Sequence, residues 1–430
     1  MAAAARHGRS LPDRAAQALS MAASAAPIDL CLEGARVAHA CGAVHAPLAL
    51  RAGRIAAAAT PAALRIDLHG QLVLPGLINA HEHLHVNAVP PLPQAAPFAN
   101  SYAWIDAFAA HFRTPAVTAA LALPKSLRLR HGGLKNLLAG VTCVAHHDPW
   151  HAALDAADFP VALLRDFGWS YTLHGPDYGP PLAQSFAAAS AAGWPWMIHL
   201  AEGTDAVAAS ELAELERRGY LADNTVLIHG VGLGADDVAR VLACGAAVVW
   251  CPSSNLTLLG RTLDPQRLSA AGRLALGSDA RVSGGRDLLE DLRLAAAHGL
   301  DPTQALRLAT TAAADILRMP DRGHLATGAH ADLLIVADRG GAPANSLVGL
   351  PRSALRAVVR DGRPRIADPD FAAWFAAAGV DTVPVTLDGT PKLLAAELAD
   401  PTLLALEPGL ELHVAPPRSH TTQLSQECTA

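Results

Sequence analysis

Three histidines and one aspartate follow closely on short apolar runs of the sequence. They are His81, His83, His199 and Asp279. Side chains two residues apart on a strand point the same way, so His81 and His83 can reach one ion. Three imidazoles and a carboxylate suit a borderline divalent cation such as zinc or iron. The residue types and spacing therefore predict a metal site at the ends of several strands.

A rival interpretation uses the same segment. The residues 81–85 (HEHLH) also fit HExxH, a pattern that places two zinc-binding histidines on one face of a helix. Here the motif follows a Pro-Gly pair and a strand-like run, and three prolines come soon after it, so a full-length helix has little room. We therefore favour a strand, and His85 then becomes a loop residue.

Short apolar runs alternate with Ala- and Leu-rich stretches through residues 73–322. This alternation is typical of repeated βα units whose strands are buried on both faces. Eight candidate strands are 77–80, 141–145, 161–164, 170–173, 196–198, 225–228, 246–250 and 274–276. Eight parallel strands predict an α/β fold of the (β/α)8 TIM-barrel type, with its site at the carboxyl ends of the strands. Too few residues separate the third and fourth runs for a crossover helix, so one is degenerate or misplaced.

The flanks of this region have a different pattern. Residues 28–72 and 323–384 contain short strand-like runs split by glycine and proline. We expect both flanks to build one small composite β-sandwich beside the barrel. Residues 1–27 are expected to be a flexible tail, within which Met21 is an alternative start, and residues 385–430 a C-terminal extension with a mobile end.

Composition excludes several classes of protein. The chain has 430 residues, of which 51% are apolar and 17% charged, unlike a disordered chain. A net charge of −6 gives no basic surface for nucleic acid, and no run of about 18 uncharged apolar residues is present to span a membrane. The six cysteines show no CxxC pairing, which fits a reducing compartment. We expect a cytoplasmic protein with a small-molecule substrate.

Seven segments match, in chain order, a pattern known from one enzyme superfamily. They are LPGLINAHEH (74–83), GVTCVAHHD (140–148), LHGP (173–176), IHLAE (198–202), LIHGVGL (227–233), WCPSSNLTLLG (250–260) and LALGSDA (274–280). These segments resemble the amidohydrolase superfamily, in its cytosine-deaminase-like and triazine-hydrolase-like (chlorohydrolase) branch. The resemblance covers roughly residues 28–365, and it implies a (β/α)8 barrel with a composite β-sandwich.

The resemblance also implies a mononuclear metal site. His81, His83, His199 and Asp279 would hold one divalent ion, with zinc expected first and iron as the alternative. Many relatives bind two metals through a carboxylated lysine near the fourth strand. None of the three lysines of this chain lies there, so that bridge is not available.

Catalytic roles follow from the same resemblance. Glu202, the glutamate of an HxxE motif, would move protons between the catalytic water and the substrate nitrogen. Asp279 would also act as a general base, and His229 would bind and polarise the substrate. The alternatives are a carboxylate that only stabilises a helix N-terminus for Glu202, and a core histidine for His229.

Further residues are expected to face the substrate. His174 resembles the substrate-contacting histidine of the fourth strand, and His146 follows the second strand, whereas His147 would face the opposite way. We expect Asn255 to stabilise a loop and Cys251 to lie in the core. Residues 86–114 form a long insertion with five aromatic side chains, either a lid over a flat ring or a segment packed on the barrel rim.

The sequence therefore predicts a metal-dependent hydrolase of non-peptide carbon–nitrogen bonds, most simply a deaminase of an amino-substituted heterocycle or amidine. Opening of a cyclic amide or imidazolone ring needs the same residues and stays open. A catalytically inactive barrel that serves as a binding module is the alternative from another class, while phosphoryl transfer lacks a Gly-rich phosphate loop. Relatives commonly associate, so a homo-oligomer also stays open.

Overall fold

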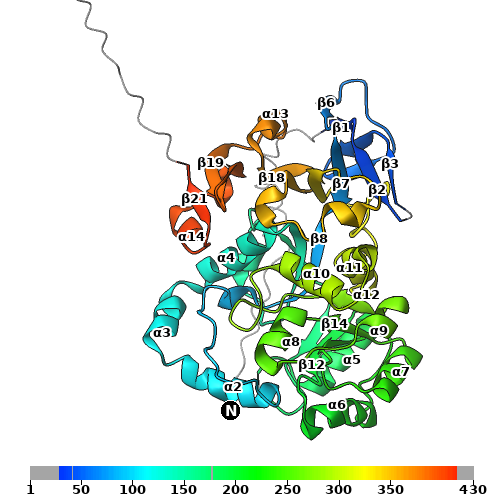
Figure 1. Cartoon of the computed structure of the whole chain (residues 1–430), viewed down its shortest axis with the longest axis vertical. Coiled ribbons are helices and arrows are strands. Elements are labelled where there is room, and N and C mark those ends of the chain that lie inside the picture. The colour runs from blue at the N-terminus through cyan, green and yellow to red at the C-terminus, as the bar shows by residue number, and fades with distance from the viewer. Residues whose placement is uncertain (1–28, 41, 176–177, 414–430) are drawn as a thin grey trace, which may run out of the picture.

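The computed structural model describes residues 29–40, 42–175 and 178–413 (Figure 1). The expectations for the tail 1–27, for Met21 as a start and for the end of the chain lie outside the described residues. Strands of both chain ends gather at one end of the molecule, and the α/β part lies at the other (Figure 1). None of the described helices is long and apolar enough to cross a membrane.

Eight short strands follow one another in chain order through the α/β part. They are β8 (Leu77–Glu82), β9 (Val141–His146), β10 (Ala162–Leu163), β11 (Gly168–Ser170), β12 (Trp196–Leu200), β13 (Thr225–His229), β14 (Ala247–Trp250) and β15 (Leu274–Leu276). The first three form one parallel sheet and the other five form another. An isolated parallel bridge between Glu82 and Asp279 brings β8 beside the end of β15.

The barrel prediction is confirmed in part. The strands run parallel in chain order with helices between them, which gives a TIM-barrel-like α/β fold. No closed barrel is formed, because no pairing joins β10 to β11 among the described residues. The interruption falls at the third unit, where β10 has only two residues and the short connection to β11 holds no crossover helix.

Helices pack around these strands. They are α4 (Lys125–Leu138), α5 (Leu182–Ala192), α6 (Ala206–Arg217), α7 (Ala235–Ala243), α8 (Pro252–Leu259), α9 (Gln266–Ala270), α10 (Leu288–Ala297), α11 (Pro302–Leu308) and α12 (Thr311–Ile316). Several begin at an aspartate whose side chain accepts from backbone N–H groups of the first turn, as Asp205 does for α6 and Asp287 for α10. These caps fix where the loops before α6 and α10 end.

The segment between β8 and α4 contains α2 (Ser101–His111) and α3 (Pro115–Ala122). The first two residues of the HExxH match end strand β8, and a short 3-10 turn, Leu84–Val86, follows it. The strand interpretation of this segment is therefore confirmed. The HExxH helix of a zinc protease is absent from it.

Two more sheets make up the β-rich end. The four-stranded sheet contains β1 (Asp29–Glu33), β4 (Leu48–Arg51), β5 (Arg54–Ala56) and β6 (Leu64–Asp67). The nine-stranded sheet contains β2 (Arg36–His39), β3 (Gly42–His45), β7 (Gln71–Pro75), β16 (Leu333–Ala337), β17 (Ala357–Arg360), β18 (Arg363–Ala367), β19 (Thr382–Leu387), β20 (Thr390–Ala395) and β21 (Leu410–Leu412). Two short helices, α13 (Ala372–Ala377) and α14 (Pro401–Ala405), lie among the last strands.

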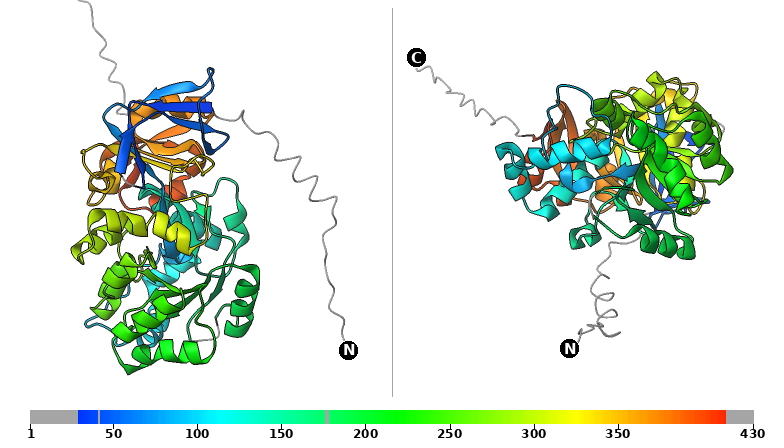
Figure 2. Two further views of the ribbon diagram at one scale, coloured as in Figure 1. Left: turned by 90° about the vertical axis from the view of Figure 1, so that its right-hand side faces the viewer. Right: turned by 90° about the horizontal axis from the view of Figure 1, so that it is seen from below.

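Both flanks of the chain therefore share one sheet. Strand β7 of the N-terminal flank pairs antiparallel with β16 of the C-terminal flank, and blue and orange strands lie together in Figure 2. The same sheet takes up β19 to β21, so the described part of the C-terminal extension belongs to it. That the two sheets pack face to face as a sandwich stays a prediction.

Candidate active site

The four predicted metal ligands lie together at the carboxyl ends of the parallel strands. Nε2 of His83 is 3.3 Å from Nε2 of His199 and 3.5 Å from Oδ1 of Asp279, and Nε2 of His81 is 3.6 Å from the same oxygen. Ligand bonds of about 2.0–2.1 Å in a tetrahedron place ligand atoms about 3.3 Å apart. The spacing thus fits a tetrahedral divalent ion.

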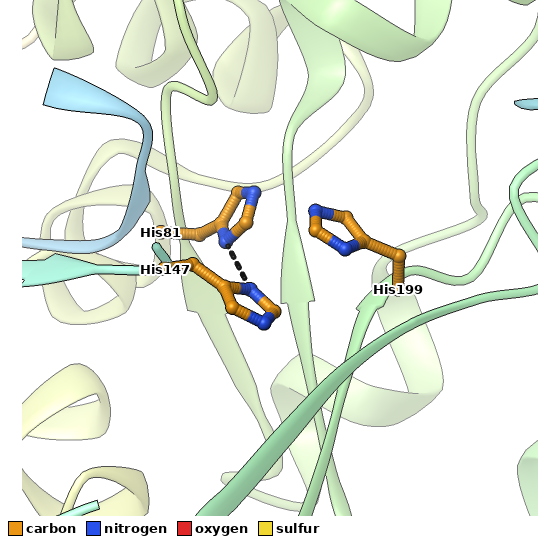
Figure 3. Close-up of side chains that lie close together, drawn as sticks. All are labelled: His81, His147 and His199. Carbon is orange, nitrogen blue, oxygen red and sulfur yellow. Dashed lines mark hydrogen bonds between the residues drawn. The ribbon is translucent and has the colours of Figure 1, made fainter. Parts of the chain in front are cut away.

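The His81 ring offers a free lone pair to the centre, the space between the four ligand side chains. Its Nε2 is buried without a hydrogen-bond partner, while its Nδ1 lies 3.2 Å from Nδ1 of His147. Nε2 of His147 donates to the carbonyl oxygen of Ser170 at 3.1 Å, so Nδ1 of His147 accepts and Nδ1 of His81 carries the hydrogen. Figure 3 shows this contact with His199 facing it. A cation between Nε2 of His81 and the Asp279 carboxylate would satisfy this buried lone pair.

The other two histidines are oriented in the same manner. Nδ1 of His83 donates to Oδ2 of Asp148 at 2.8 Å, and Nδ1 of His199 donates to the carbonyl oxygen of Tyr171 at 2.8 Å. Each bond fixes the tautomer that leaves Nε2 free on the side of the centre. The donor set therefore fits a divalent metal.

Asp279 is held by its second oxygen. Oδ2 accepts from the hydroxyl groups of Ser254 and Ser283, at 2.6 Å each, which leaves Oδ1 facing His81 and His83. The backbone of Asp279 has a φ of 57°, a left-handed conformation that is uncommon outside glycine and that concentrates at functional sites.

Burial and neighbouring charges shift the pKa values of His81 and His83 in opposite directions. Burial lowers the pKa of His81 to about 4, so this ring is neutral at neutral pH. Burial also disfavours the charged form of His83, but the carboxylates of Asp148 and Asp279 raise its pKa to about 9. The centre is thus an electronegative pocket that a divalent cation would neutralise.

A buried carboxyl group lies beside the ligand cluster. Burial raises the pKa of Glu202 above its usual range. Its Oε1 accepts from Nε1 of Trp104 at 3.3 Å and lies 3.7 Å from Nε2 of His229. Nδ1 of His229 is 2.8 Å from Oδ1 of Asn255, which fixes the ring so that Nε2 faces Glu202. Such a carboxyl is suited to proton transfer.

A cavity of about 450 Å³ opens over these groups. Its lining includes the titratable groups Asp148, His199, Glu202, His229 and Asp279. Much of the apolar lining comes from α2 and the residue that follows it, with Ile105, Phe108, Ala109 and Phe112. The described residues that line the cavity include no lysine and no arginine. The insertion after β8 therefore forms a wall of the site.

Two predicted substrate contacts, His146 and His174, are not among the residues that line the cavity. Nδ1 of His146 accepts from the backbone N–H of Leu84 at 3.3 Å, whereas His147 points to His81. His147 is not among the lining residues either, so the substrate contact of His146 stays a prediction.

The strand expected at 170–173 lies at 168–170, so His174 comes four residues after its end instead of directly after it. Nε2 of His174 is 3.2 Å from Oε2 of Glu214 on α6. Its role in substrate binding stays a prediction.

Several residues of the site were missed from the sequence. Asp148 orients His83 and accepts from the hydroxyl of Tyr178 at 2.8 Å, and Asn255 orients His229 instead of only stabilising a loop. Asp148 follows two histidines at a strand end, which is a signal that the sequence did contain. Cys251 is buried in an apolar cluster, as expected.

The model of the amidohydrolase family matches residues 144–365. A 5-methylthioadenosine/S-adenosylhomocysteine deaminase of Teredinibacter turnerae is 26% identical over 60% of this chain and 70% of its own. The deaminase of that name from Thermococcus kodakarensis is 31% identical over 29% of this chain and 32% of its own. Hydroxydechloroatrazine ethylaminohydrolase of a Pseudomonas species is 32% identical over 29% of this chain and 30% of its own. The first curated relatives are thus matched over about a third of their length or less.

Solved structures show the same fold. An adenosine deaminase from Xanthomonas campestris with bound zinc has a TM-score of 0.65 and 21% identity, over 83% of this chain and 98% of that chain. Atrazine chlorohydrolase from Arthrobacter aurescens complexed with zinc has a TM-score of 0.61 and 20% identity, over 81% of this chain and 100% of that chain. The family model covers more than half of the sequence, and the chain therefore belongs to the amidohydrolase family.

Proposed function

We propose that this protein is a metal-dependent hydrolase of a non-peptide carbon–nitrogen bond, which removes ammonia or an amine from an amino-substituted heterocycle or amidine. The observation that carries the proposal is the buried Glu202 carboxyl beside His229 and the four ligand side chains. The names of the curated relatives, deaminases and an ethylaminohydrolase, support this reaction class.

His81, His83, His199 and Asp279 would hold the ion, for which we propose zinc, the metal in two similar structures, with iron as the alternative. When bound, the ion would supply Lewis acidity that activates water and polarises the substrate. Lys135 pairs with Glu82 and offers no bridge to a second ion. These contacts support a mononuclear site.

Glu202 transfers the protons of the reaction. Water adds to the carbon, a C–O bond forms and the C–N bond breaks, so one proton must move from the water to the leaving nitrogen. A carboxyl whose pKa is raised by burial can accept that proton and then give it up. Asp279, held by its two serines, is the second base near the water.

His229 acts on the substrate. Asn255 fixes its ring so that Nε2 points to Glu202 and the cavity. When it carries a proton, Nε2 donates to the ring atom on which negative charge develops during attack.

The cavity favours a flat, uncharged ring with an apolar substituent. Its acidic and histidine side faces the reacting carbon, and the wall of α2 contacts the rest of the molecule. A substrate with a phosphate or carboxylate group would meet three carboxylates and no lysine or arginine among the lining residues.

We also propose a division into domains. Residues 73–322 form the catalytic barrel, and residues 28–72 with 323–384 form a composite β-sandwich. Leu32 and Leu50 of the four-stranded sheet and Leu72 of the nine-stranded sheet belong to one buried apolar cluster, which supports packing of the two sheets. The extension from residue 385 continues the larger sheet in its described part.

Ammonia release by the zinc-loaded protein from a panel of aminopurines, aminopyrimidines and aminotriazines tests the proposal. We expect turnover of at least one compound, and a loss of about 10²–10⁴-fold in kcat for Glu202→Gln with its zinc content unchanged. Glu216→Gln, at an exposed glutamate of α6 outside the cavity lining, is the control and should retain kcat. Substrate consumption without ammonia or amine release would indicate ring opening, and no turnover by the metal-loaded protein would indicate a binding module.

A further inference from the structure

A completely buried ion pair lies directly behind the metal ligands. Glu82, the last residue of β8, stands between His81 and His83 in the sequence, and Lys135 belongs to α4. Nζ of Lys135 is 2.8 Å from Oε2 of Glu82, and neither side chain reaches solvent. Apolar residues of similar volume usually stabilise a fold as well as such a pair does. Stability alone therefore does not explain why the fold buries Glu82 and Lys135.

Both oxygens of the Glu82 carboxylate accept hydrogen bonds from buried side chains. Oε2 accepts from Nδ2 of Asn136 at 2.9 Å and from the hydroxyl of Ser278 at 3.0 Å, in addition to Lys135. Oε1 accepts from Nδ2 of Asn87 at 3.0 Å. A hydrogen-bond network in a buried site is rigid, because movement leaves polar groups unpaired.

This network joins two ligand-bearing segments that are distant in sequence. Ser278 directly precedes Asp279, and its backbone N–H donates to Oδ1 of Asn79 at 3.1 Å. Oδ1 of Asn87 accepts from Lys135 at 2.9 Å and from the backbone N–H of Arg281 at 3.2 Å. Ser278 and Arg281, on either side of Asp279, are thus both hydrogen-bonded to the network around Glu82.

Main-chain contacts extend the same connection. The backbone N–H of Asp279 donates to the carbonyl of His81, and the N–H of His83 donates to the carbonyl of Asp279, at 3.1 Å each. The carbonyl of Glu82 accepts from the N–H of His147, which orients His81 through its ring. His81, His83 and Asp279 are therefore fixed relative to one another through residue 82.

We propose that Glu82 and Lys135 are positioning residues for the metal site. The pair locks the loop 278–281 onto the end of β8, so that three of the four ligand atoms converge before the ion binds. Neither side chain is among those that line the cavity. This inference rests on the metal site of the proposed function, and it is independent of the substrate.

The consequence is a gain in metal affinity through preorganisation. Removing an interaction that orients a metal ligand typically lowers metal affinity about 10–100-fold. Glu82→Gln places an amide N–H among donors, and Lys135→Met leaves the carboxylate without its cation. Ser278→Ala removes one link to the Asp279 segment and leaves no unpaired charge, so it is the variant with the mildest effect on folding.

The test measures zinc dissociation constants of the full chain by competition with a chromophoric chelator, together with the absorption spectrum of the cobalt-loaded protein. We expect about 10–100-fold weaker zinc binding in Glu82→Gln and Lys135→Met, a smaller loss in Ser278→Ala, and altered cobalt spectra in all three. The matched control is Lys392→Met, which removes a buried lysine that bonds the carbonyl of Leu355 at 2.7 Å in the nine-stranded sheet. It should leave zinc affinity and the cobalt spectrum unchanged.

Folded Ser278→Ala and Glu82→Gln with wild-type zinc affinity and spectra would overturn the positioning role. An equal loss of affinity in Lys392→Met would also overturn it, because the effect would then be one of general stability. Wild-type protein that binds no zinc would contradict the proposed function itself, which separates the two failures.

Discussion

At the scale of single residues, each ligand is oriented by the partner on its far side. His147 holds His81, Asp148 holds His83, and the carbonyl of Tyr171 holds His199. Trp104 holds Glu202 in a comparable way, since its indole N–H donates to Oε1. A precise site thus depends on residues that take no direct part in the chemistry.

Trp104→Phe should lower kcat about tenfold, because the loss of one hydrogen bond to a charged group costs roughly 1.5 kcal/mol. The bond favours the ionised carboxylate, so its loss raises the pKa of Glu202 further. Glu202 would then lose its proton at higher pH, and the acidic limb of the kcat/KM profile should move to higher pH. The measurement is that profile for the wild type and the variant.

The matched control is Trp150→Phe, since the Trp150 side chain is exposed and bonds Asp155 outside the cavity lining. It should leave the profile in place. An unmoved acidic limb in Trp104→Phe would mean that this indole does not act on the proton-transfer group.

Residues at strand ends were the predictable part of the site. His81, His83, His199 and Asp279 could be expected to converge, because the carboxyl ends of parallel strands meet whatever the exact register. The choice between His146 and His147 could not be made, since it depends on one residue of register. Trp104 could not be placed either, because its segment is positioned by contacts distant in sequence, such as that of Asn100 with Asp205 at 2.6 Å.

At the scale of elements, α2 gives the cavity its apolar wall. The helix begins at Asn100, which accepts from the N–H of Ala103, and the N–H of Ser101 bonds the carbonyl of Glu202 at 2.8 Å. Tyr102 bonds Glu211 on α6. The wall is thus connected to the segment that carries the proton-transfer group.

Phe108→Ala should raise KM about tenfold for substrates with an apolar substituent, while kcat changes little, because the lost contacts are remote from the reacting carbon. The comparison uses one aminated ring with a butyl or a methyl substituent. The KM of the variant should rise more for the butyl compound than for the methyl compound. An equal rise in KM for both compounds would exclude Phe108 from substrate recognition.

Strands with strong apolar patterns were predictable from the sequence. The bounds of β10 and β11, in the third βα unit, were not. The two-residue β10 and the early end of β11 follow from a connection too short for a helix, which sequence periodicity does not position. The same displacement moves His174 away from the strand end.

At the scale of the whole molecule, Glu407 connects the C-terminal extension to the barrel. It is buried, and it lies 3.0 Å from Nε2 of His131 and 2.7 Å from the guanidinium of Arg281, and it also bonds Arg352. Burial opposes its ionisation, but the hydrogen bond with His131 and the guanidinium groups of Arg281 and Arg352 hold its pKa far below the usual range. Arg281 lies two residues after Asp279, so the extension supports the loop of the site.

Glu407→Gln should lower the free energy of unfolding by about 3 kcal/mol near neutral pH, since it leaves buried cations unpaired. The folded-state pKa lies below the unfolded value of about 4.3, so the unfolded state binds more protons as pH falls. The stabilisation is complete above about pH 5 and is lost below it. Urea unfolding of both proteins should therefore show a difference that shrinks below about pH 4. A difference that does not depend on pH would contradict the role of this charge.

A single metal site formed by three histidines and Asp279 underlies the proposed reaction. The most direct test is the metal content of the purified and reconstituted protein, with Asp279→Ala beside Asp155→Ala, an exposed aspartate, as control. We expect about one zinc or iron per chain in the wild type and in Asp155→Ala, and none in Asp279→Ala. No metal in the wild type, or an unchanged content in Asp279→Ala, would contradict the account.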